Sequence, residues 1–331
     1  MALLEVQNLT VVLQTQRGPA RAVRDVSFTL ERGQTLGLVG ESGCGKSITA
    51  MSLMGLLPEN AQVTGSIRFD GQELVGKGER EMCELRGDRI GMIFQEPMTA
   101  LNPVHSIGRQ VAEPLRLHRG MGAAQARKEA IALLDRVGIP DAARRIDAYP
   151  HQFSGGQRQR ITIAMALACG PDLLIADEPT TALDVTIQQQ ILDLIRELVA
   201  ERGMALILIS HDLGVVAQNV RRMMVMYGGS VVESGPTAEV FAHRMQPYTL
   251  GLFGARPGLN TARGQRLATI PGTVPELADL PAGCPFAGRC RFTIPECHAT
   301  VPPPYEVGPD HHARCIRLDA VAAEKRAGPV A

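Results

Sequence analysis

The chain has 331 residues, of which 45% are hydrophobic and 21% charged, which excludes a disordered chain. At about 150 residues per domain, this length predicts two domains. The 34 basic residues equal the 34 acidic ones, which argues against a general nucleic-acid binder, because such proteins carry a basic excess.

Membrane-directed segments are not expected in this sequence. Its first residues have no basic region followed by an apolar stretch, so they do not resemble a signal peptide. The longest candidate for a spanning helix, residues 161–175, is interrupted by Gly170, Pro171 and Asp172 and is too short to span a membrane. We therefore expect a protein that is cytosolic and soluble, or one that is bound to a membrane only through another protein.

The predicted elements of the first 240 residues alternate between strands and helices. Hydrophobic patterning predicts strands at 3–13, 22–30, 35–40, 66–70, 89–95, 173–177 and 204–210, and helices at 47–57, 123–137 and 186–202. The last two strands are continuous apolar runs, which is typical of buried parallel strands. The order predicts an α/β fold with a mainly parallel sheet and a helical insert.

A phosphate-binding loop is predicted between strand 35–40 and helix 47–57. The residues match G-x-x-x-x-G-K-[ST] and are Gly40, Glu41, Ser42, Gly43, Cys44, Gly45, Lys46 and Ser47. The glycines let backbone N–H groups surround phosphate oxygens at a helix N-terminus, Lys46 reaches the β- and γ-phosphates, and Ser47 holds Mg²⁺. The alternative is a glycine-rich turn that caps a helix, and Cys44 is expected only to fill space.

Two acidic residues and a second glycine-rich turn extend this prediction. Asp177 and Glu178 end a parallel strand, where ligands bind, so Asp177 is expected to hold Mg²⁺ and Glu178 to orient or deprotonate water. Alternatively, the two acids simply start a helix before Pro179. The turn precedes an apolar helix with an N-cap serine, and taken alone indicates only a capped helix; its residues are Ser154, Gly155, Gly156 and Gln157.

These motifs occur in an order that resembles the ATPases of ABC transporters. The phosphate loop, SGGQ at 154–157, LLIADEPTTALD at 173–184 and LISHD at 208–212 carry a resemblance that spans about residues 3–240. It implies a RecA-like P-loop core, an N-terminal antiparallel β subdomain and a helical subdomain at about 97–160. It also implies that two cassettes enclose two ATP molecules, with residues 154–157 of one against the γ-phosphate held by the other.

The same resemblance assigns roles to four further residues. Gln95 would contact Mg²⁺ and the attacking water, His211 the γ-phosphate, and Asp184 would connect the two sites. Without the resemblance, His211 is equally well an ordinary residue at the end of a strand. Leu13 stands where the family usually has an aromatic residue against adenine, so we expect weaker selectivity for ATP over GTP.

A narrower resemblance is to the dipeptide and oligopeptide importer branch, which also includes ATPases serving nickel and glutathione. It rests on residues 94–115, 149–160, 247–253 and 270–290; Gln157 and Gln246 replace the branch's usual Met and His. It implies a second, homologous ATPase, two transmembrane permease subunits and, indirectly, an extracytoplasmic binding protein. The expected location is peripheral, on the cytoplasmic side of the bacterial inner membrane, with residues 97–103 as the docking segment.

The last 90 residues differ in composition, which predicts a domain boundary near residue 240. Of the 22 prolines, 11 lie between Pro247 and Pro309, and four of the seven cysteines follow the spacing C-x5-C-x6-C-x17-C. We therefore expect an ABC ATPase domain at 1–240 and an irregular metal-dependent domain at 241–331. The cysteines are Cys284, Cys290, Cys297 and Cys315.

Spacing alone leaves the ligand of these cysteines open between zinc, an iron–sulfur cluster and free thiols, since disulfides are disfavoured in a reducing cytosol. The branch resemblance implies a [4Fe–4S] cluster, as in some members. His298, His311 and His312 lie nearby and are possible substitute ligands.

The expected function is ATP hydrolysis that drives import of peptides or similar small cargo. Two alternatives are a soluble ABC ATPase acting on nucleic acid or ribosomes and an ATPase regulated by the redox state of its cysteines. Neutral charge, a single cassette and the importer-like tail argue against the first alternative.

Overall fold

The structure is a computed structural model that describes residues 2–181, 183–255 and 269–327. Its centre is an eight-stranded sheet with the order β11-β12-β10-β9-β3-β8-β7-β6. Five of these strands run parallel: β3 (Thr35–Val39), β6 (Ile90–Ile93), β7 (Leu173–Asp177), β8 (Ala205–Ser210) and β9 (Arg222–Tyr227). Every residue of β6, β7 and β8 is buried, which confirms the prediction of central parallel strands from continuous apolar runs.

The N-terminal strands form a second, antiparallel sheet against one face of the central sheet. Its order is β2-β1-β4-β5, and its strands are β1 (Ala2–Thr15), β2 (Gly18–Glu31), β4 (Gln62–Phe69) and β5 (Gln72–Glu73). Side chains alternate across a strand. Accordingly Leu173 and Ile175 pack into the core shared with this second sheet, whereas Leu174 and Ala176 pack into the core on the other face.

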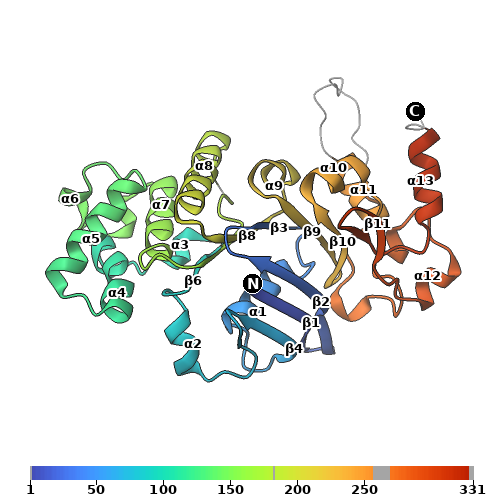
Figure 1. Cartoon of the computed structure of the whole chain (residues 1–331), viewed down its shortest axis with the longest axis horizontal. Coiled ribbons are helices and arrows are strands. Elements are labelled where there is room, and N and C mark those ends of the chain that lie inside the picture. The colour runs from blue at the N-terminus through green and yellow to red at the C-terminus, as the bar shows by residue number, and fades with distance from the viewer. Residues whose placement is uncertain (1, 182, 256–268, 328–331) are drawn as a thin grey trace.

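Helices occupy both cores. The helix after the phosphate loop, α1 (Lys46–Met54), packs into the core between the two sheets. The opposite face is covered by α8 (Val185–Arg202) and α9 (Leu213–Asn219), together with α7 (Gly155–Ala166). The short helix α2 (Glu79–Leu85) follows β5 and precedes β6 in the chain, and Figure 1 shows it below β6.

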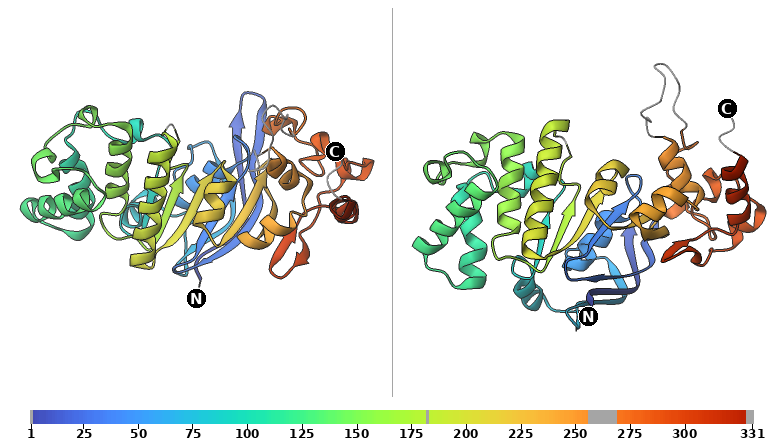
Figure 2. Two further views of the ribbon diagram at one scale, coloured as in Figure 1. Left: turned by 90° about the horizontal axis from the view of Figure 1, so that it is seen from above. Right: turned by 45° about the horizontal axis from the view of Figure 1, so that its top comes forward.

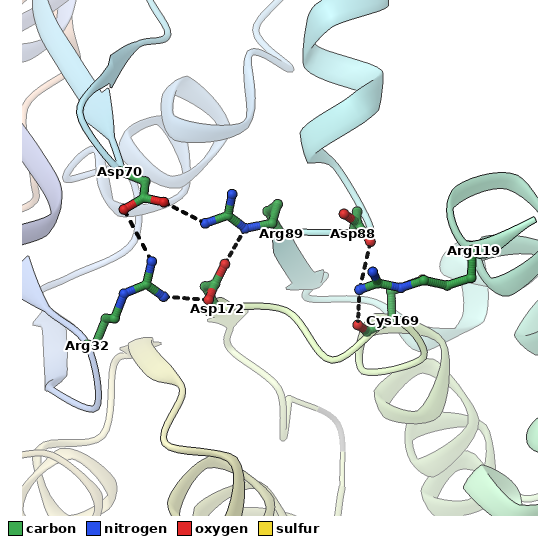
Figure 3. Close-up of polar contacts among 7 residues, drawn as sticks. All are labelled: Arg32, Asp70, Asp88, Arg89, Arg119, Cys169 and Asp172. Carbon is green, nitrogen blue, oxygen red and sulfur yellow. Dashed lines mark hydrogen bonds and ion pairs between the residues drawn. The ribbon is translucent and has the colours of Figure 1, made fainter.

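An ionic network joins the two sheets where their strands begin or end (Figure 3). Asp70 follows β4 and accepts hydrogen bonds from Arg32 at 3.2 Å and Arg89 at 2.8 Å. Asp172, just before β7, pairs with the same two arginines. Two carboxylates and two guanidinium groups thus form a closed ring between segments far apart in the sequence. Charges balanced in this way stabilise partly buried positions better than isolated surface pairs do.

The inserted helices lie at one end of the molecule, as Figure 1 shows. They are α3 (Pro97–Ala100), α4 (Ile107–Arg119), α5 (Ala123–Arg136), α6 (Ala142–Arg145), the 3-10 turn η1 (Pro150–Gln152) and the start of α7. In α5, Ala126, Ala130 and Leu134 are fully buried, as the helical spacing predicted. The limits of 97–160 for this subdomain stay a prediction.

The C-terminal segment packs at the other end, which both views of Figure 2 show. After β10 (Ser230–Pro236) it contains α10 (Thr237–His243), α11 (Pro247–Gly254), η2 (Leu277–Asp279), η3 (Ala287–Arg289), α12 (Pro295–Ala299), β11 (Tyr305–Gly308), β12 (His311–Ala313) and α13 (Leu318–Ala327). Strand β12 pairs with β10 through Glu233 with Ala313 and Ser234 with His312. The predicted irregular tail therefore adds two strands to the main sheet, and its boundary at residue 240 stays a prediction.

Across the described ranges, we find no helix that combines the length and the apolar character needed to cross a membrane.

Candidate functional site

The phosphate loop connects the end of β3 to the start of α1. Gly40 and Gly45 have φ values of +152° and +104°, which side chains rarely adopt. A Cβ atom at Gly40 would lie 2.3 Å from the carbonyl oxygen of Met226, and one at Gly45 would lie 2.7 Å from that of Ala22. The backbone therefore requires glycine at both positions, which supports a close-fitting loop over a simple glycine-rich turn.

Lys46 lies inside this loop. Its side chain is buried, and Nζ donates hydrogen bonds to the carbonyl oxygens of Gly40 at 2.8 Å and Glu41 at 3.1 Å. The ammonium group thus lies within the ring of loop backbone, beside the N-terminus of α1, where two sources of positive charge favour an anion. Cys44 is buried as the expected small filler, and burial raises the pKa of its thiol.

Asp177 and Ser47 form a site that fits a divalent cation. Asp177 is 3% exposed, and its Oδ1 is buried without a hydrogen-bond partner among the described residues. Burial raises the pKa of this carboxyl, while a hydrogen bond from Ser47 lowers it. A buried carboxylate oxygen without a partner, next to a hydroxyl, matches the oxygen ligands that Mg²⁺ prefers. Asp177 and Ser47 are therefore the residues that would hold the ion.

Glu178 lies beside this pair, and three side chains contact one oxygen of its carboxylate. Its Oε2 accepts hydrogen bonds from Gln95 Nε2 at 3.3 Å and Thr181 Oγ1 at 3.0 Å, and lies 3.2 Å from His211 Nδ1. Gln95, Glu178 and His211 follow the adjacent strands β6, β7 and β8 at their carboxyl ends, where ligands bind in parallel sheets. The structure brings together the three residues predicted for catalysis; their catalytic roles stay predictions.

Thr181 is a contact that the sequence analysis missed. It stands three residues after Glu178 and bonds back to its carboxylate. Glu178 itself has a φ of +46°, an unusual conformation for a residue with a side chain. This backbone turn directs the chain away from β7, and the spacing E-P-T-T was the one signal that could have indicated the contact.

The second glycine-rich turn lies on the surface at the start of α7. Ser154 Oγ accepts a hydrogen bond from the Gln157 N–H at 3.3 Å, and Gln157 Oε1 accepts one from the Ser154 N–H at 3.2 Å, a reciprocal capping box. Ser154 and Gly155 are exposed, and a Cβ atom on Gly156 would lie 2.8 Å from Ile187 in α8. The starts of α7 and α8 are therefore in close contact.

Asp184 caps α8 beside this turn, and its side chain accepts a hydrogen bond from the Ile187 N–H at 3.0 Å. The next residue, Val185, is 82% exposed. Leu13 is half-buried in β1 opposite Ala20 and packs against the core between the sheets. The predicted roles of Asp184 and Leu13, like those of residues 154–157, stay predictions.

The four C-terminal cysteines line one narrow cavity of about 10 Å³ together with Phe286 and Phe292. Burial, together with the neighbouring thiols, raises the pKa of Cys284 to about 12 and that of Cys315 to about 11. Within the part of the chain that the structure describes, no three His, Cys, Asp or Glu side chains are arranged to hold a metal ion. The four thiols predicted to act together lie around one cavity, whereas their role as ligands and the metal itself stay predictions.

The three histidines near the cysteines are placed differently from one another. His311 is fully buried, and its Nε2 lies 2.8 Å from Glu233 Oε1, so it is already paired outside the thiol cavity. His298 is exposed, and His312 pairs in the sheet with Ser234 of β10. None of the three lines the thiol cavity.

Comparisons with known proteins agree with this geometry. Residues 23–181 match the family described as ABC transporter, and residues 232–297 match the family described as oligopeptide/dipeptide transporter, C-terminal region. A putative peptide import ATP-binding protein of Brucella melitensis is 52% identical, over 97% of this chain and 98% of its own length. The oligopeptide transport ATP-binding protein OppD of Mycobacterium tuberculosis is 49% identical, over 98% of this chain but 53% of its own length.

Solved structures resemble the cassette part of the chain. A dimeric ATP-binding cassette in a post-hydrolysis state, bound to ADP and Pi, has a TM-score of 0.63 and 28% identity, covering 71% of this chain and 98% of that one. The protein cbiO1 from Clostridium perfringens, part of an ABC transporter complex, has a TM-score of 0.62 and 29% identity, covering 73% and 92%. These matches confirm the predicted α/β cassette fold.

Proposed function

The chain belongs to the ATP-binding subunits of ABC transporters, and we propose that it hydrolyses ATP to drive import of peptides or similar small cargo. The observation that carries the ATPase proposal is the cluster at Glu178 Oε2 beside Asp177 and the phosphate loop. The C-terminal match and the names of the relatives support peptide cargo.

The chemistry follows from the side chains of the site. Lys46 and the loop amides would hold the β- and γ-phosphates, and Ser47 and Asp177 would hold Mg²⁺, which would supply positive charge against those phosphates. Glu178, fixed in one orientation by three neighbours, accepts a proton from water as the water attacks the γ-phosphate. Gln95 and His211 orient that water and the phosphate oxygens.

A second, homologous ABC ATPase subunit completes the proposed site. Residues Ser154 and Gly155 lie exposed beside Asp184 and Val185, at the joined starts of α7 and α8. A hydrophobic side chain as exposed as Val185 next to open helix amides fits a surface that is covered in a dimer. The dimeric state of the similar cassette supports this arrangement.

The proposed contact with the membrane subunits lies next to Gln95. An apolar groove is lined by Leu56, Met92, Phe94 and Leu117, three of which have exposed side chains. Ala100, from the predicted docking segment 97–103, also lines this groove, which fits an amphipathic helix of a permease subunit. We place the chain peripherally at the cytoplasmic side of the inner membrane, with two permeases and, indirectly, an extracytoplasmic binding protein.

Two measurements test this function. Lys46→Ala should abolish ATP binding to the purified chain, and unchanged binding would refute the phosphate-loop assignment. Co-purification of the expressed chain should bring two membrane subunits and a second cassette. Recovery of nucleic acid or ribosomes instead would favour the soluble ABC ATPase.

For the cysteines, the proposal is a [4Fe–4S] cluster held by Cys284, Cys290, Cys297 and Cys315. A zinc ion needs its four sulfurs at about 2.3 Å from one point, whereas a cluster spreads its thiolates further apart. The four thiols line one cavity, which supports a shared ligand, and the resemblance to the importer branch is the ground for proposing a cluster over zinc. The absorbance of anaerobically purified protein should show iron–sulfur bands, and a colourless protein with stoichiometric zinc would contradict the proposal.

Redox control of the ATPase is the second candidate function for this cavity. Cys290 directly follows Arg289, which contacts the phosphate loop. ATPase rates before and after oxidation of the cluster test it, and equal rates leave the cavity with a structural role only.

A further inference from the structure

Two side chains of the C-terminal segment converge on Glu41, the second residue of the phosphate loop. The Glu41 N–H donates a hydrogen bond to the hydroxyl oxygen of Tyr248 at 2.7 Å. Arg289 donates from Nη1 to Glu41 Oε2 at 2.8 Å and from Nη2 to Oε1 at 3.2 Å. Because Lys46 binds the Glu41 carbonyl, the amide, the carbonyl and the carboxylate of this one residue are all engaged.

The guanidinium group of Arg289 is also fixed by hydrogen bonds to the backbone of its own C-terminal segment. Its side chain is 7% exposed, Nε donates to the carbonyl oxygen of Pro271 at 2.9 Å, and Nη2 also donates to that of Gly272 at 3.3 Å. The guanidinium group lies 5.8 Å from the ring centre of Tyr227. An arginine fixed by this many partners restrains the carboxylate that it binds.

Tyr248 is equally fixed, by the core of the C-terminal segment. Its ring is fully buried and lies 4.6 Å from that of Tyr227 and 5.3 Å from that of Phe286. Burial raises the pKa of its hydroxyl, so the group stays neutral and accepts the Glu41 N–H. The backbone N–H of Tyr248 donates to Gln246 Oε1 at 2.5 Å, which caps α11. The position of the hydroxyl is therefore set by packed, capped structure.

The charge of Glu41 needs this partner. A carboxylate in the loop that binds phosphates repels them, and the repulsion is strong where the site is partly shielded from water. Arg289 neutralises that carboxylate through two hydrogen bonds, at a position where the Glu41 side chain is 29% exposed. The pair allows an acidic residue in a loop built for anions.

We propose that Arg289 and Tyr248 are positioning residues of the ATP site, so that the C-terminal segment completes the phosphate loop. Arg289 neutralises and orients the carboxylate of Glu41, and Tyr248 fixes the backbone amide of the same residue. The inference rests on the proposed ATP site at residues 40–47. It also gives a role to Tyr248 in the segment 247–253, which lies outside the cassette and outside the proposed dimer surface.

The same segments also border the thiol cavity. Phe286, Gln246 and Pro247 line it, and Arg289 directly precedes Cys290. Residues in direct contact or adjacent in the chain therefore connect the lining of the thiol cavity to the phosphate loop.

The test is equilibrium binding of Mg·ATP to the purified full chain. Arg289→Ala should weaken ATP affinity by about tenfold, the usual effect of losing a charge-assisted pair. Tyr248→Phe should weaken it by about threefold, since one neutral hydrogen bond is lost. The matched control is Arg291→Ala, because Arg291 is 63% exposed, pairs with Glu324, and should change the affinity less than about twofold.

A double variant separates positioning from mere structural support. Combining Glu41→Gln with Arg289→Ala removes the unpaired charge, so ATP affinity should return to within about threefold of wild type. Absence of any rescue would overturn the proposal, as would wild-type affinity in Arg289→Ala. Arg289→Lys keeps the positive charge and replaces the alanine variant if that variant does not fold. Its ATP affinity should lie within about threefold of wild type, because Glu41 keeps a charged partner.

Lys46→Ala in the same assay distinguishes two failures. If Lys46→Ala loses ATP binding while Arg289→Ala retains it, the positioning role is wrong and the ATP site stands. If Lys46→Ala itself binds ATP normally, the proposed ATP site is wrong.

Discussion

Replacing Glu178 by glutamine tests the central chemistry with the smallest change of shape. Three donors or potential donors, from Gln95, Thr181 and His211, lie 3.0 to 3.3 Å from Glu178 Oε2. The amide oxygen of glutamine can occupy the same point and accept the same hydrogen bonds, so the site should keep its geometry. We expect ATP affinity within about threefold of wild type, because only the charge is lost.

The turnover of this variant should fall far more than its affinity. A neutral amide cannot accept the proton of the attacking water, and loss of a general base costs about 10²- to 10⁴-fold in rate. The assay is phosphate release by the assembled transporter in membranes, with ATP binding measured in parallel. Glu239→Gln is the matched control, because Glu239 also contacts a histidine, His243, at 3.6 Å, outside the site.

The outcome of this pair of measurements is decisive for Glu178. Turnover at the wild-type rate in Glu178→Gln would show that another group accepts the proton. Loss of ATP binding along with turnover would show that the carboxylate acts by shaping the site. Only intact binding with lost turnover fits the assigned role.

Three further changes have defined consequences. Asp177→Asn should lose Mg²⁺-dependent ATP binding, yet its Tm at pH 7 should be about 2–4 °C higher than that of wild type. Burial raises the pKa of Asp177, so the folded state takes up this proton at a higher pH than the unfolded state does. The Tm of wild type should therefore approach that of the variant as the pH falls through the raised pKa toward 3.8, and a constant difference would refute this reasoning. Asp172→Ala should lower the free energy of unfolding by about 1–2 kcal/mol in urea, since it opens the ring with two arginines, whereas Asp193→Ala, in an exposed pair, should cost less than about 0.5 kcal/mol. Leu13→Tyr should tighten both ATP and GTP by about five- to tenfold through base stacking, and unchanged affinities would remove Leu13 from the base site.

Local patterns were sufficient to predict the phosphate-binding motifs of the cassette. The glycines and lysine at 40–47, the apolar runs of β7 and β8, and the acids that end β7 each depend on residues next to one another in the chain. Strand and helix periodicity and loop chemistry are local properties, so they can be read before the chain is folded. The order of the motifs then supplied the family.

Other features depended on residues brought together from distant parts of the chain. The Glu178 cluster joins segments 83 and 33 residues apart, and the Glu41–Arg289 pair joins positions 248 residues apart. No periodicity or spacing encodes such contacts. The strands β11 and β12 were missed for the same reason, because four- and three-residue strands carry little pattern and exist through pairing with β10.

The sequence by itself therefore determined the composition of a folded chain, a neutral net charge, the motifs of the cassette and the set of phosphate-binding residues. Only the tertiary structure decided that the proline- and cysteine-rich tail packs onto the phosphate loop through Tyr248 and Arg289. The physical reason is that a motif records which groups are available, whereas the partner of a carboxylate or an amide depends on what the fold packs beside it.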